Sequence, residues 1–319
     1  MLREVPERTL RSLLLALSQQ RWLGRAATRL QFTRPMVGRF VAGQTLDEAL
    51  DALAVLRAAG LRTTVDVLGE SVTSTEAAAA AADRYLRTLD ALAERGLDRN
   101  VSLKLSQMGL EIDRGSCRDN VARILRRAEE LEAFVRIDME DHTKVDPTLD
   151  LWRELRPLHQ ATGVVIQAAL RRSAADVERL IGERAPIRLC KGAYREPASV
   201  AFTDKAEVDR NYAALMAELL RRGAHTALAT HDERLIRRAI EIVEGEGIDR
   251  ARFEFQMLYG VRRDLQERLV AAGYGVRVYV PYGSEWYPYF MRRLAERPAN
   301  VTFLLRSLFR EGAGSRRPG

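Results

Sequence analysis

Short hydrophobic runs alternate with longer amphipathic stretches along the chain from about residue 61 onward. The short runs are rich in β-branched residues and are predicted to be strands: Arg62–Leu68, Val101–Leu105, Phe134–Met139, Val164–Ala168, Ile187–Cys190, Thr226–Thr230, Phe253–Leu258 and Val276–Val280. The stretches between them have apolar residues at helical spacing and are predicted to be helices, among them Ser74–Arg95, Asp119–Ala133, Ser173–Gly182, Glu207–Arg222 and Glu233–Gly245.

Strict alternation of strands and helices is typical of a parallel sheet, because each connection between parallel strands crosses over through a helix. Eight such units within residues 61–310 favour a (βα)8 barrel of the α/β class over an open doubly wound sheet. The first predicted strand is not followed by a GxGxxG sequence, which weakens the dinucleotide-binding alternative. We therefore expect one catalytic barrel domain over residues 61–310.

The first sixty residues are predicted to be a helical segment that precedes the barrel. One helical stripe is formed by Leu10, Leu13, Leu14 and Leu17. Thr45 and Glu48 have the spacing of a capping box, and the helix that they open is expected to stop at Gly60. This segment could lie on a membrane surface, but we favour packing against the barrel. Residues 311–319, rich in Gly, Arg, Ser and Pro, are predicted to be a disordered tail.

Composition changes this picture mainly through the basic residues. The net charge is +7, but only four of the 51 basic residues are lysines, which leaves 51 − 4 = 47 arginines. Such a bias reflects codon usage better than it reflects a nucleic-acid partner. Arginine replaces lysine on a solvated surface but not where a compact ammonium is required, so each lysine marks a candidate site.

Several classes of protein are excluded at this point. Two cysteines do not make a disulfide scaffold or a four-cysteine zinc site, and they fit a reducing compartment. No apolar run approaches the roughly 20 residues of a membrane-spanning helix. The four histidines lack the spacing of a metal site, and neither a GxSxG nor a Walker A sequence occurs. We therefore expect no metal.

Each predicted strand ends at or near a polar residue, and this end of a (βα)8 barrel is where the active site lies. Lys104, Asp138 and Gln167 sit inside apolar runs, where an unpaired polar group is costly. Strand ends are polar wherever they meet loops, and a buried Asp and Lys can simply pair, but we favour a functional cluster. All the lysines fall on this predicted face: Lys104, Lys144, Lys191 and Lys205.

A final amphipathic helix is predicted over Glu285–Arg297. One side has the apolar stripe Tyr287, Phe290, Met291 and Leu294, and the adjacent side has Tyr289, Arg292, Arg293 and Glu296. Two neighbouring arginines suit a carboxylate or phosphate clamp, whereas a solvated face with an Arg292–Glu296 pair explains them equally well.

The strand ends and the last helix form an ordered set of motifs: Asp66-Val-Leu-Gly-Glu70, Ser102-Leu-Lys-Leu-Ser106, Ile137-Asp138-Met-Glu140, Gln167, Arg188-Leu-Cys-Lys-Gly-Ala-Tyr194, Ala229-Thr-His231, Phe253-Glu-Phe-Gln-Met-Leu258 and Tyr289-Phe-Met-Arg-Arg-Leu-Ala-Glu296. Taken in this order, the motifs resemble the proline dehydrogenase family over roughly residues 60 to 305. The chain looks like the single-function bacterial form, because it is too short to include the fused aldehyde dehydrogenase of the bifunctional relatives.

The resemblance implies a distorted (βα)8 barrel that holds FAD at the carboxyl ends of the strands. The implied reaction oxidises L-proline to Δ1-pyrroline-5-carboxylate, the first step of proline catabolism to glutamate. A hydride passes to flavin N5, and the electrons then pass to a membrane quinone. A separate pyrroline-5-carboxylate dehydrogenase would act next, and the enzyme would be cytoplasmic with peripheral contact to the inner face of the bacterial membrane.

The resemblance also implies a role for individual residues. Arg188 would lie by flavin N5, Asp138 would order the polar network beside Lys104, and Glu70 would close the site by pairing with Arg292. The proline carboxylate and ring would be held by Lys104, Arg292, Arg293, Tyr279, Tyr194 and Leu258. The flavin would be held by Met139, Gln167, Arg188, Lys191, Gly192, Ala193, Thr230, His231 and Gln256.

Two other readings of the sequence stay open. A lysine Schiff-base aldolase on the same barrel would use Lys191 or Lys104 as its nucleophile, although Gly260 and Gly283 offer little for a phosphate-binding loop. A basic module that binds nucleic acid or acidic membrane would lose affinity steeply with salt. The scattered arginines, without interleaved aromatic residues, argue against that module.

Overall fold

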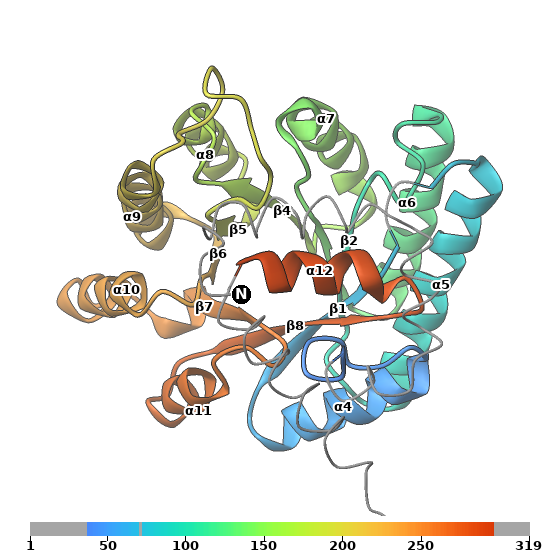
Figure 1. Cartoon of the computed structure of the whole chain (residues 1–319), viewed down its shortest axis with the longest axis horizontal. Coiled ribbons are helices and arrows are strands. Elements are labelled where there is room, and N and C mark those ends of the chain that lie inside the picture. The colour runs from blue at the N-terminus through green and yellow to red at the C-terminus, as the bar shows by residue number, and fades with distance from the viewer. Residues whose placement is uncertain (1–36, 70–71, 297–319) are drawn as a thin grey trace, which may run out of the picture.

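The computed structural model describes residues 37–69 and 72–296, with only the backbone described for residues 292 and 294–296. Within these residues the sheet is a closed barrel of parallel strands in chain order, seen end-on in Figure 1. The strands are β1 (Arg62–Val67), β2 (Asn100–Leu103), β3 (Phe134–Ile137), β4 (Thr162–Gln167), β5 (Pro186–Cys190), β6 (His225–Ala229), β7 (Phe253–Leu258) and β8 (Val276–Tyr282). The predicted (βα)8 barrel is confirmed, because β8 closes the sheet by pairing with β1.

A ring of helices covers the outside of the barrel between successive strands. They are α5 (Thr75–Glu94), α6 (Arg114–Glu130), α7 (Val145–Leu155), α8 (Ser173–Gly182), α9 (Lys205–Arg222), α10 (Glu233–Gly245) and α11 (Arg263–Ala271). The five predicted helices are present, and α8 and α10 have the predicted bounds. Helix α6 begins earlier than predicted because the Asp113 side chain caps it, accepting a hydrogen bond from Ser116 N.

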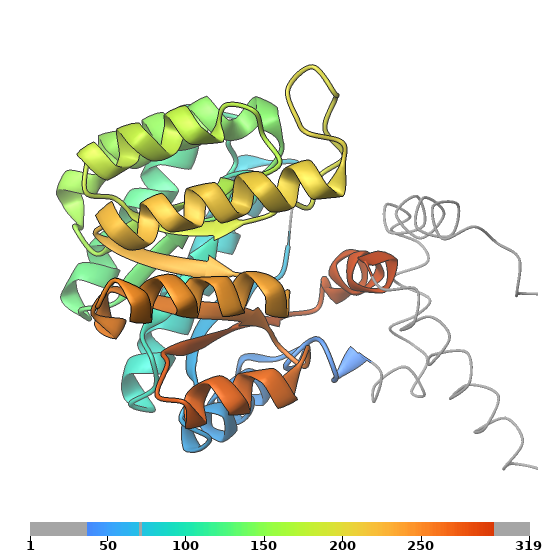
Figure 2. The same cartoon turned by 90° about the vertical axis from the view of Figure 1, so that its left-hand side faces the viewer.

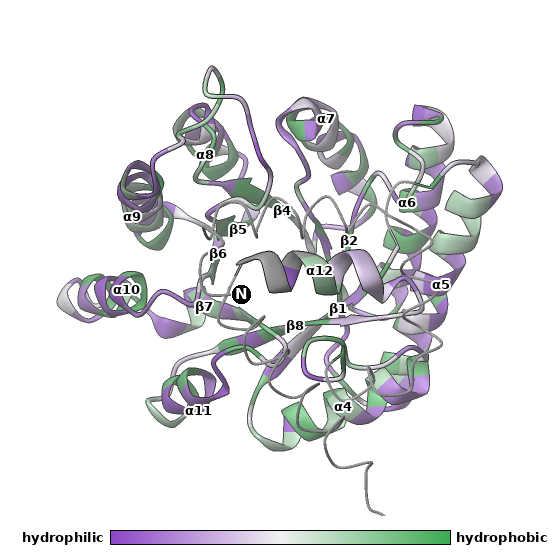
Figure 3. Cartoon of the chain, in the orientation of Figure 1, coloured by the Kyte–Doolittle hydropathy of each residue, from purple (hydrophilic) through white to green (hydrophobic). Residues whose placement is uncertain are grey.

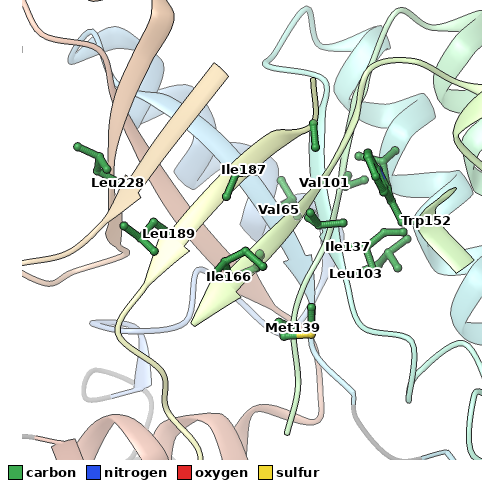
Figure 4. Packing of buried hydrophobic residues seen from close by; sticks show 14 of the residues in the cluster. Val65, Val101, Leu103, Ile137, Met139, Trp152, Ile166, Ile187, Leu189 and Leu228 are labelled. Atoms are coloured by element: carbon green, nitrogen blue, oxygen red, sulfur yellow. The ribbon is translucent and has the colours of Figure 1, made fainter. Parts of the chain in front are cut away.

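The hydrophobic core lies between the sheet and this ring of helices. Val65, Val101, Ile137 and Ile187 are completely buried there, and Figure 4 shows them together with Trp152 of α7. The outer helices carry both hydrophobic and hydrophilic residues (Figure 3), as expected for helices with one buried face. Because side chains alternate across a strand, the residues between these apolar positions point into the barrel.

Two strands that contribute to the site are shorter than the sequence predicts. Strand β2 ends at Leu103 and β3 at Ile137, so Lys104 and Asp138 are the first residues beyond their strands. The chain turns at once after β2, where Gln107 N and Met108 N both donate to Lys104 O. These side chains therefore lie at the mouth of the barrel rather than inside the strands.

Helices α4 (Leu46–Ala58) and α12 (Trp286–Glu296) depart from the regular ring. The predicted capping box opens α4, with Thr45 and Glu48 exchanging side chain–backbone hydrogen bonds. Helix α4 packs outside β1 and β8, where the helix after β8 would lie in a regular barrel. Helix α12 instead crosses the carboxyl-end mouth of the barrel (Figures 1 and 2).

The segment Val37–Gly43, called here the anchor segment, holds α12 in this position. A small apolar cluster, separate from the main core, consists of Val37, Phe40, Val41, Leu68, Trp286, Tyr289, Phe290 and Met291. The rings of Phe40 and Phe290 have centroids 6.2 Å apart. Backbone hydrogen bonds fasten the segment to the end of β8 and to the residue after it, from Ala42 N to Pro281 O at 2.9 Å and from Gly283 N to Gly43 O at 3.0 Å.

The outermost sequence predictions fall beyond the described residues. The stripe Leu10, Leu13, Leu14 and Leu17 and the tail 311–319 both lie outside them. The division into residues 1–60, 61–310 and 311–319 therefore stays a prediction. Among residues 37–69 and 72–296, no helix is both long and apolar enough to cross a lipid bilayer.

Candidate active site

Arg188 of β5 is the centre of a polar network inside the barrel. Its guanidinium donates to Asp138 Oδ1 at 2.5 Å, to Gln256 Oε1 at 2.5 Å and to Ser102 Oγ at 2.9 Å. These partners come from β2, β7 and the end of β3, whereas the neighbours of β5 in the sheet are β4 and β6. Contacts between strands that are not neighbours place all four side chains in the barrel interior.

Lys104 lies at the open end of the same network. Its ammonium is 3.2 Å from Asp66 Oδ1, 3.3 Å from the Tyr279 hydroxyl and 3.6 Å from Asp138 Oδ2. The Tyr279 hydroxyl donates to Asp138 Oδ2 at 2.7 Å. Asp138 thus accepts from Arg188 with one oxygen and from Tyr279 with the other, so it joins the two halves of the network.

Charge is balanced within this network. Two carboxylates, Asp66 and Asp138, face two cations, Lys104 and Arg188, and the side chain of Lys104 is 14% exposed while that of Asp66 is 2% exposed. Buried charges at such short separations stabilise one another, and removing one leaves its partner unpaired in a site of low polarity. Burial of its hydroxyl, with the charges of Asp138 and Asp66, raises the pKa of Tyr279 well above its ordinary value, so the phenol stays a hydrogen-bond donor.

Lys191 belongs to a second cluster at the ends of β5 and β6. Its ammonium is 2.5 Å from Asp209 of α9 and 3.0 Å from Asp232, the N-cap of α10. Lys205 and Arg234 also contact Asp209. Burial raises the pKa of Asp232, but hydrogen bonds from Lys191 and Arg234 outweigh burial and hold it at about 2.

The residues predicted to hold a cofactor lie on or just after the ends of β3, β4, β5, β6 and β7. Gln167 donates to Glu140 O at 2.8 Å, and His231 Nε2 accepts from Leu258 N at 3.0 Å. Gly192 has a φ of +111°, and a side chain there would meet Ala169 and Gln167. Thr230 is buried and directly follows β6, Met139 is buried and lies two residues after β3, and Ala193 is exposed and lies three residues after β5.

Other predicted residues lie apart from the network. Tyr194 is 40% exposed on the loop after β5, and Leu258 ends β7 next to His231. Arg293 lies over the ring of Tyr289 at 5.2 Å on α12, and Tyr289 is buried although the sequence placed it beside the arginines. Glu70 and the side chain of Arg292 lie outside the described residues.

Sequence reasoning missed several partners of these residues. Ser102 and Asp66 stood in the motifs but received no role, although Asp66 lies near the end of its predicted run. Asp209 lies within a helix, so it is not among the polar residues at the strand ends. Its only local signal is the i, i+4 spacing from Lys205. Glu254 was noted within its strand and left without a role.

All the lysines lie at the carboxyl-end side of the barrel, as predicted. Lys104 and Lys191 each contact two carboxylates, Lys205 begins α9, and Lys144 follows β3 and contacts Glu111 at 2.5 Å. The scarcity of lysine in the sequence therefore indicated the correct face of the molecule.

Comparison with known proteins identifies relatives of this chain. A family model described as proline dehydrogenase matches residues 49–306. The chain is 43% identical over 277 residues to a proline dehydrogenase of Deinococcus radiodurans, covering 85% of this chain and 89% of that protein. It is 39% identical over 298 residues to proline dehydrogenase 2 of Bacillus subtilis, covering 93% of this chain and 98% of that protein.

A solved structure of a longer protein contains the same fold. Proline utilization A (PutA) of Bdellovibrio bacteriovorus, inactivated by N-propargylglycine, matches with a TM-score of 0.76 at 29% identity. The match covers 82% of this chain and 32% of the longer PutA chain. Since a family model spans most of the chain and two relatives share about two fifths of its residues, the chain belongs to the proline dehydrogenase family of enzymes.

Proposed function

We propose that the chain oxidises L-proline to Δ1-pyrroline-5-carboxylate at the mouth of the barrel, with FAD as the hydride acceptor and a quinone as the final electron acceptor. The observation that supports this most is the balanced network of Lys104, Asp66, Asp138, Arg188 and Tyr279, which lies where the barrel fold places its active sites.

The donor groups around the mouth fit a flavin. The edge of a flavin ring presents nitrogen and oxygen acceptors, and the ends of the strands offer a guanidinium, an amide and a hydroxyl, those of Arg188, Gln167 and Thr230. Gln256 would support the flavin through Arg188, toward which its amide oxygen is turned. The positive φ of Gly192, which a glycine adopts without strain, brings the chain after β5 against the end of β4, so a cofactor there would meet backbone as well as side chains. When bound, FAD supplies the acceptor for the hydride that leaves the proline ring carbon next to nitrogen.

The substrate carboxylate would lie between Lys104 and the arginines of α12. The side chain of Lys104 is the most exposed charged side chain of the network, and α12, which carries Arg292 and Arg293, crosses the mouth of the barrel. Adjacent guanidinium groups bind a carboxylate in two-point geometry, which fixes its orientation as well as its position. Tyr279, Tyr194 and Leu258 would contact the ring, and Glu70 would pair with Arg292 to close the site.

Asp138 is assigned the role of ordering these groups. One oxygen holds Arg188 and the other holds Tyr279, while Lys104 lies 3.6 Å away. Because Asp138 contacts two cations and a hydroxyl, it keeps these groups in one geometry. A fixed geometry holds the donor carbon of the substrate close to the hydride acceptor. The remaining flavin contacts are assigned to Met139, Lys191, Ala193 and His231.

The aldolase reading has less support. A Schiff-base lysine must attack as an uncharged amine, whereas Lys104 lies against Asp66 and Asp138, and Lys191 lies against Asp209 and Asp232. The family match also concerns a dehydrogenase. We therefore assign these lysines to binding rather than to covalent catalysis.

The proposed partners follow from the proposed reaction. A membrane quinone requires the enzyme to approach the bilayer, so we place it in the cytoplasm with peripheral contact to the inner face of the membrane, and without a nucleic-acid partner. A separate pyrroline-5-carboxylate dehydrogenase would consume the product.

The visible spectrum of the purified protein tests the proposal. We expect flavin absorbance that is bleached by anaerobic L-proline and restored by a soluble quinone analogue. D-Proline is the control, because it is the enantiomer of L-proline and has the same functional groups. A colourless protein, or a coloured protein that L-proline does not bleach, contradicts the proposed function.

A further inference from the structure

A buried chain of hydrogen bonds runs from the base of the barrel up to Arg188. Arg277 of β8 donates from Nε to Glu254 Oε1 at 2.7 Å, and Gln256 donates from Nε2 to the same oxygen at 2.7 Å. Gln256 Oε1 in turn accepts from Arg188 Nε at 2.5 Å. Glu254 and Gln256 are 2% and 4% exposed, so neither group exchanges these partners for water.

This chain defines which way the Gln256 amide points. A carboxylate has only acceptors and a guanidinium has only donors, whereas an amide has one of each kind of end. Gln256 therefore turns its NH2 toward Glu254 and its oxygen toward Arg188. Burial raises the pKa of Glu254, but the charge of Arg277 and the hydrogen bonds from Arg277 and Gln256 outweigh burial and hold it at about 2, so the acceptor persists at neutral pH.

The orientation matters because Arg188 is held at three points. Its other two hydrogen bonds are to Asp138 and Ser102, which come from the end of β3 and from β2 rather than from β7. If the amide turned around, its NH2 would face the guanidinium, and two donors would oppose each other in a buried site. Arg188 would then lose the contact that fixes its Nε edge.

We infer that Glu254 is a positioning residue: it orients the Gln256 amide, and through that amide it fixes the guanidinium of Arg188. The inference rests on the proposed function, because that function places Arg188 next to the flavin. A purely structural role, in which Glu254 only neutralises Arg277 and Arg62, is the competing account, since both arginines contact its carboxylate.

Two conservative variants separate these accounts. Glu254→Gln removes the charge but keeps the length of the side chain. It also keeps one acceptor oxygen, to which both Arg277 and Gln256 would donate. Glu254→Asp keeps the charge and shortens the reach by one methylene. Positioning predicts that Glu254→Gln retains the anaerobic rate of flavin reduction at saturating proline within about twofold and that Glu254→Asp loses about tenfold. If Glu254 only neutralises the arginines, Glu254→Asp should retain the rate and Glu254→Gln should lose it.

Two further readouts do not depend on turnover. We expect crystal structures of the holoenzyme to keep the contact between Arg188 Nε and Gln256 Oε1 in Glu254→Gln and to show it broken in Glu254→Asp. We also expect the flavin midpoint potential to shift only in Glu254→Asp. The control is Asp176→Asn, which alters a buried carboxylate on α8 that pairs with Arg172 and Arg179, away from the network. It should lower the melting temperature and leave the reduction rate unchanged.

The inference is overturned if Glu254→Asp behaves as the unaltered enzyme, or if Glu254→Gln is as slow as Glu254→Asp. It is also overturned if the contact between Arg188 and Gln256 is the same in both variant structures. Failure of the proposed function has a different signature, since an enzyme without flavin would give no reduction rate at all while the structures would still report the position of Arg188.

Discussion

At the scale of single residues, Lys104 illustrates why arginine does not replace lysine everywhere in an arginine-rich chain. Its ammonium lies within 3.6 Å of Asp66, Asp138 and the Tyr279 hydroxyl. An ammonium is compact and directs its donors to three sides, whereas a guanidinium is planar and longer. The network therefore accommodates the ammonium of a lysine and not the guanidinium of an arginine.

We expect Lys104→Arg to fold and to lose proline turnover. The larger guanidinium cannot keep three separate partners, so kcat/KM for proline should fall by about a hundredfold while flavin content is retained. Steady-state kinetics and flavin absorbance measure the two effects. The matched control is Lys144→Arg, since Lys144 contacts only Glu111 among the pairs described and lies outside the network. Full activity of Lys104→Arg would contradict the role assigned to the ammonium.

At the scale of elements, the position of α12 depends on a contact far away in the sequence. The anchor segment Val37–Gly43 packs against α12, and its Arg39 carbonyl lies against Gly260 in the loop after β7. A Cβ at Gly260 would lie 1.6 Å from Arg39 O, which is far inside contact distance. The absence of a side chain at Gly260 is thus what allows the anchor segment to reach its place.

We expect Gly260→Ala to displace the anchor segment and, with it, α12. The KM for proline should rise about threefold to tenfold, because the arginines proposed to bind the carboxylate move with the helix, while flavin content stays constant. Gly247→Ala is the matched control: φ is +62° there and +70° at Gly260, but nothing lies within 4 Å of its added Cβ. Both variants should lose about 1 kcal/mol of stability from the positive φ alone. Equal KM values in the two variants would contradict the anchoring role.

At the scale of the whole molecule, charged groups inside the barrel and at its mouth link its stability to pH. The pKa of Glu254 is held at about 2 against an ordinary value of 4.5, and that of Asp232 at about 2 against 3.8. The folded state therefore binds fewer protons than the unfolded chain between these values. The stabilisation is complete above about pH 4.5 and is lost as the pH falls toward 2.

We expect the free energy of unfolding to decrease as the pH falls from 5 to 2. Glu254 alone should contribute on the order of 3 kcal/mol of this decrease, because each pKa unit corresponds to about 1.4 kcal/mol. Urea denaturation at a series of pH values measures the change. Glu254→Gln lacks the titrating group and should show a smaller decrease over the same range. An equal decrease in the variant and the unaltered protein would show that folding does not lower the pKa of Glu254.

Much of the fold and the chemistry of the site could be predicted from the sequence, because both depend on local patterns. Alternate apolar positions and helical stripes specify strands and helices wherever they occur, and eight units in succession leave the closed barrel as the favoured arrangement. Strand ends then identify Lys104, Asp138 and Arg188 as neighbours in space. Strand lengths were less predictable, since the chain after β2 turns at Lys104 although apolar residues continue to Leu105.

Only the tertiary structure decided how these groups pair. Arg188 meets Ser102, Asp138 and Gln256 because closure of the barrel brings three separate strands around one guanidinium. Likewise, α12 crosses the mouth because the anchor segment holds it there and α4 fills the space outside β8. The pattern along a strand has a period of two residues and specifies which side chains point inward, but the partners of an inward side chain depend on how the whole sheet closes.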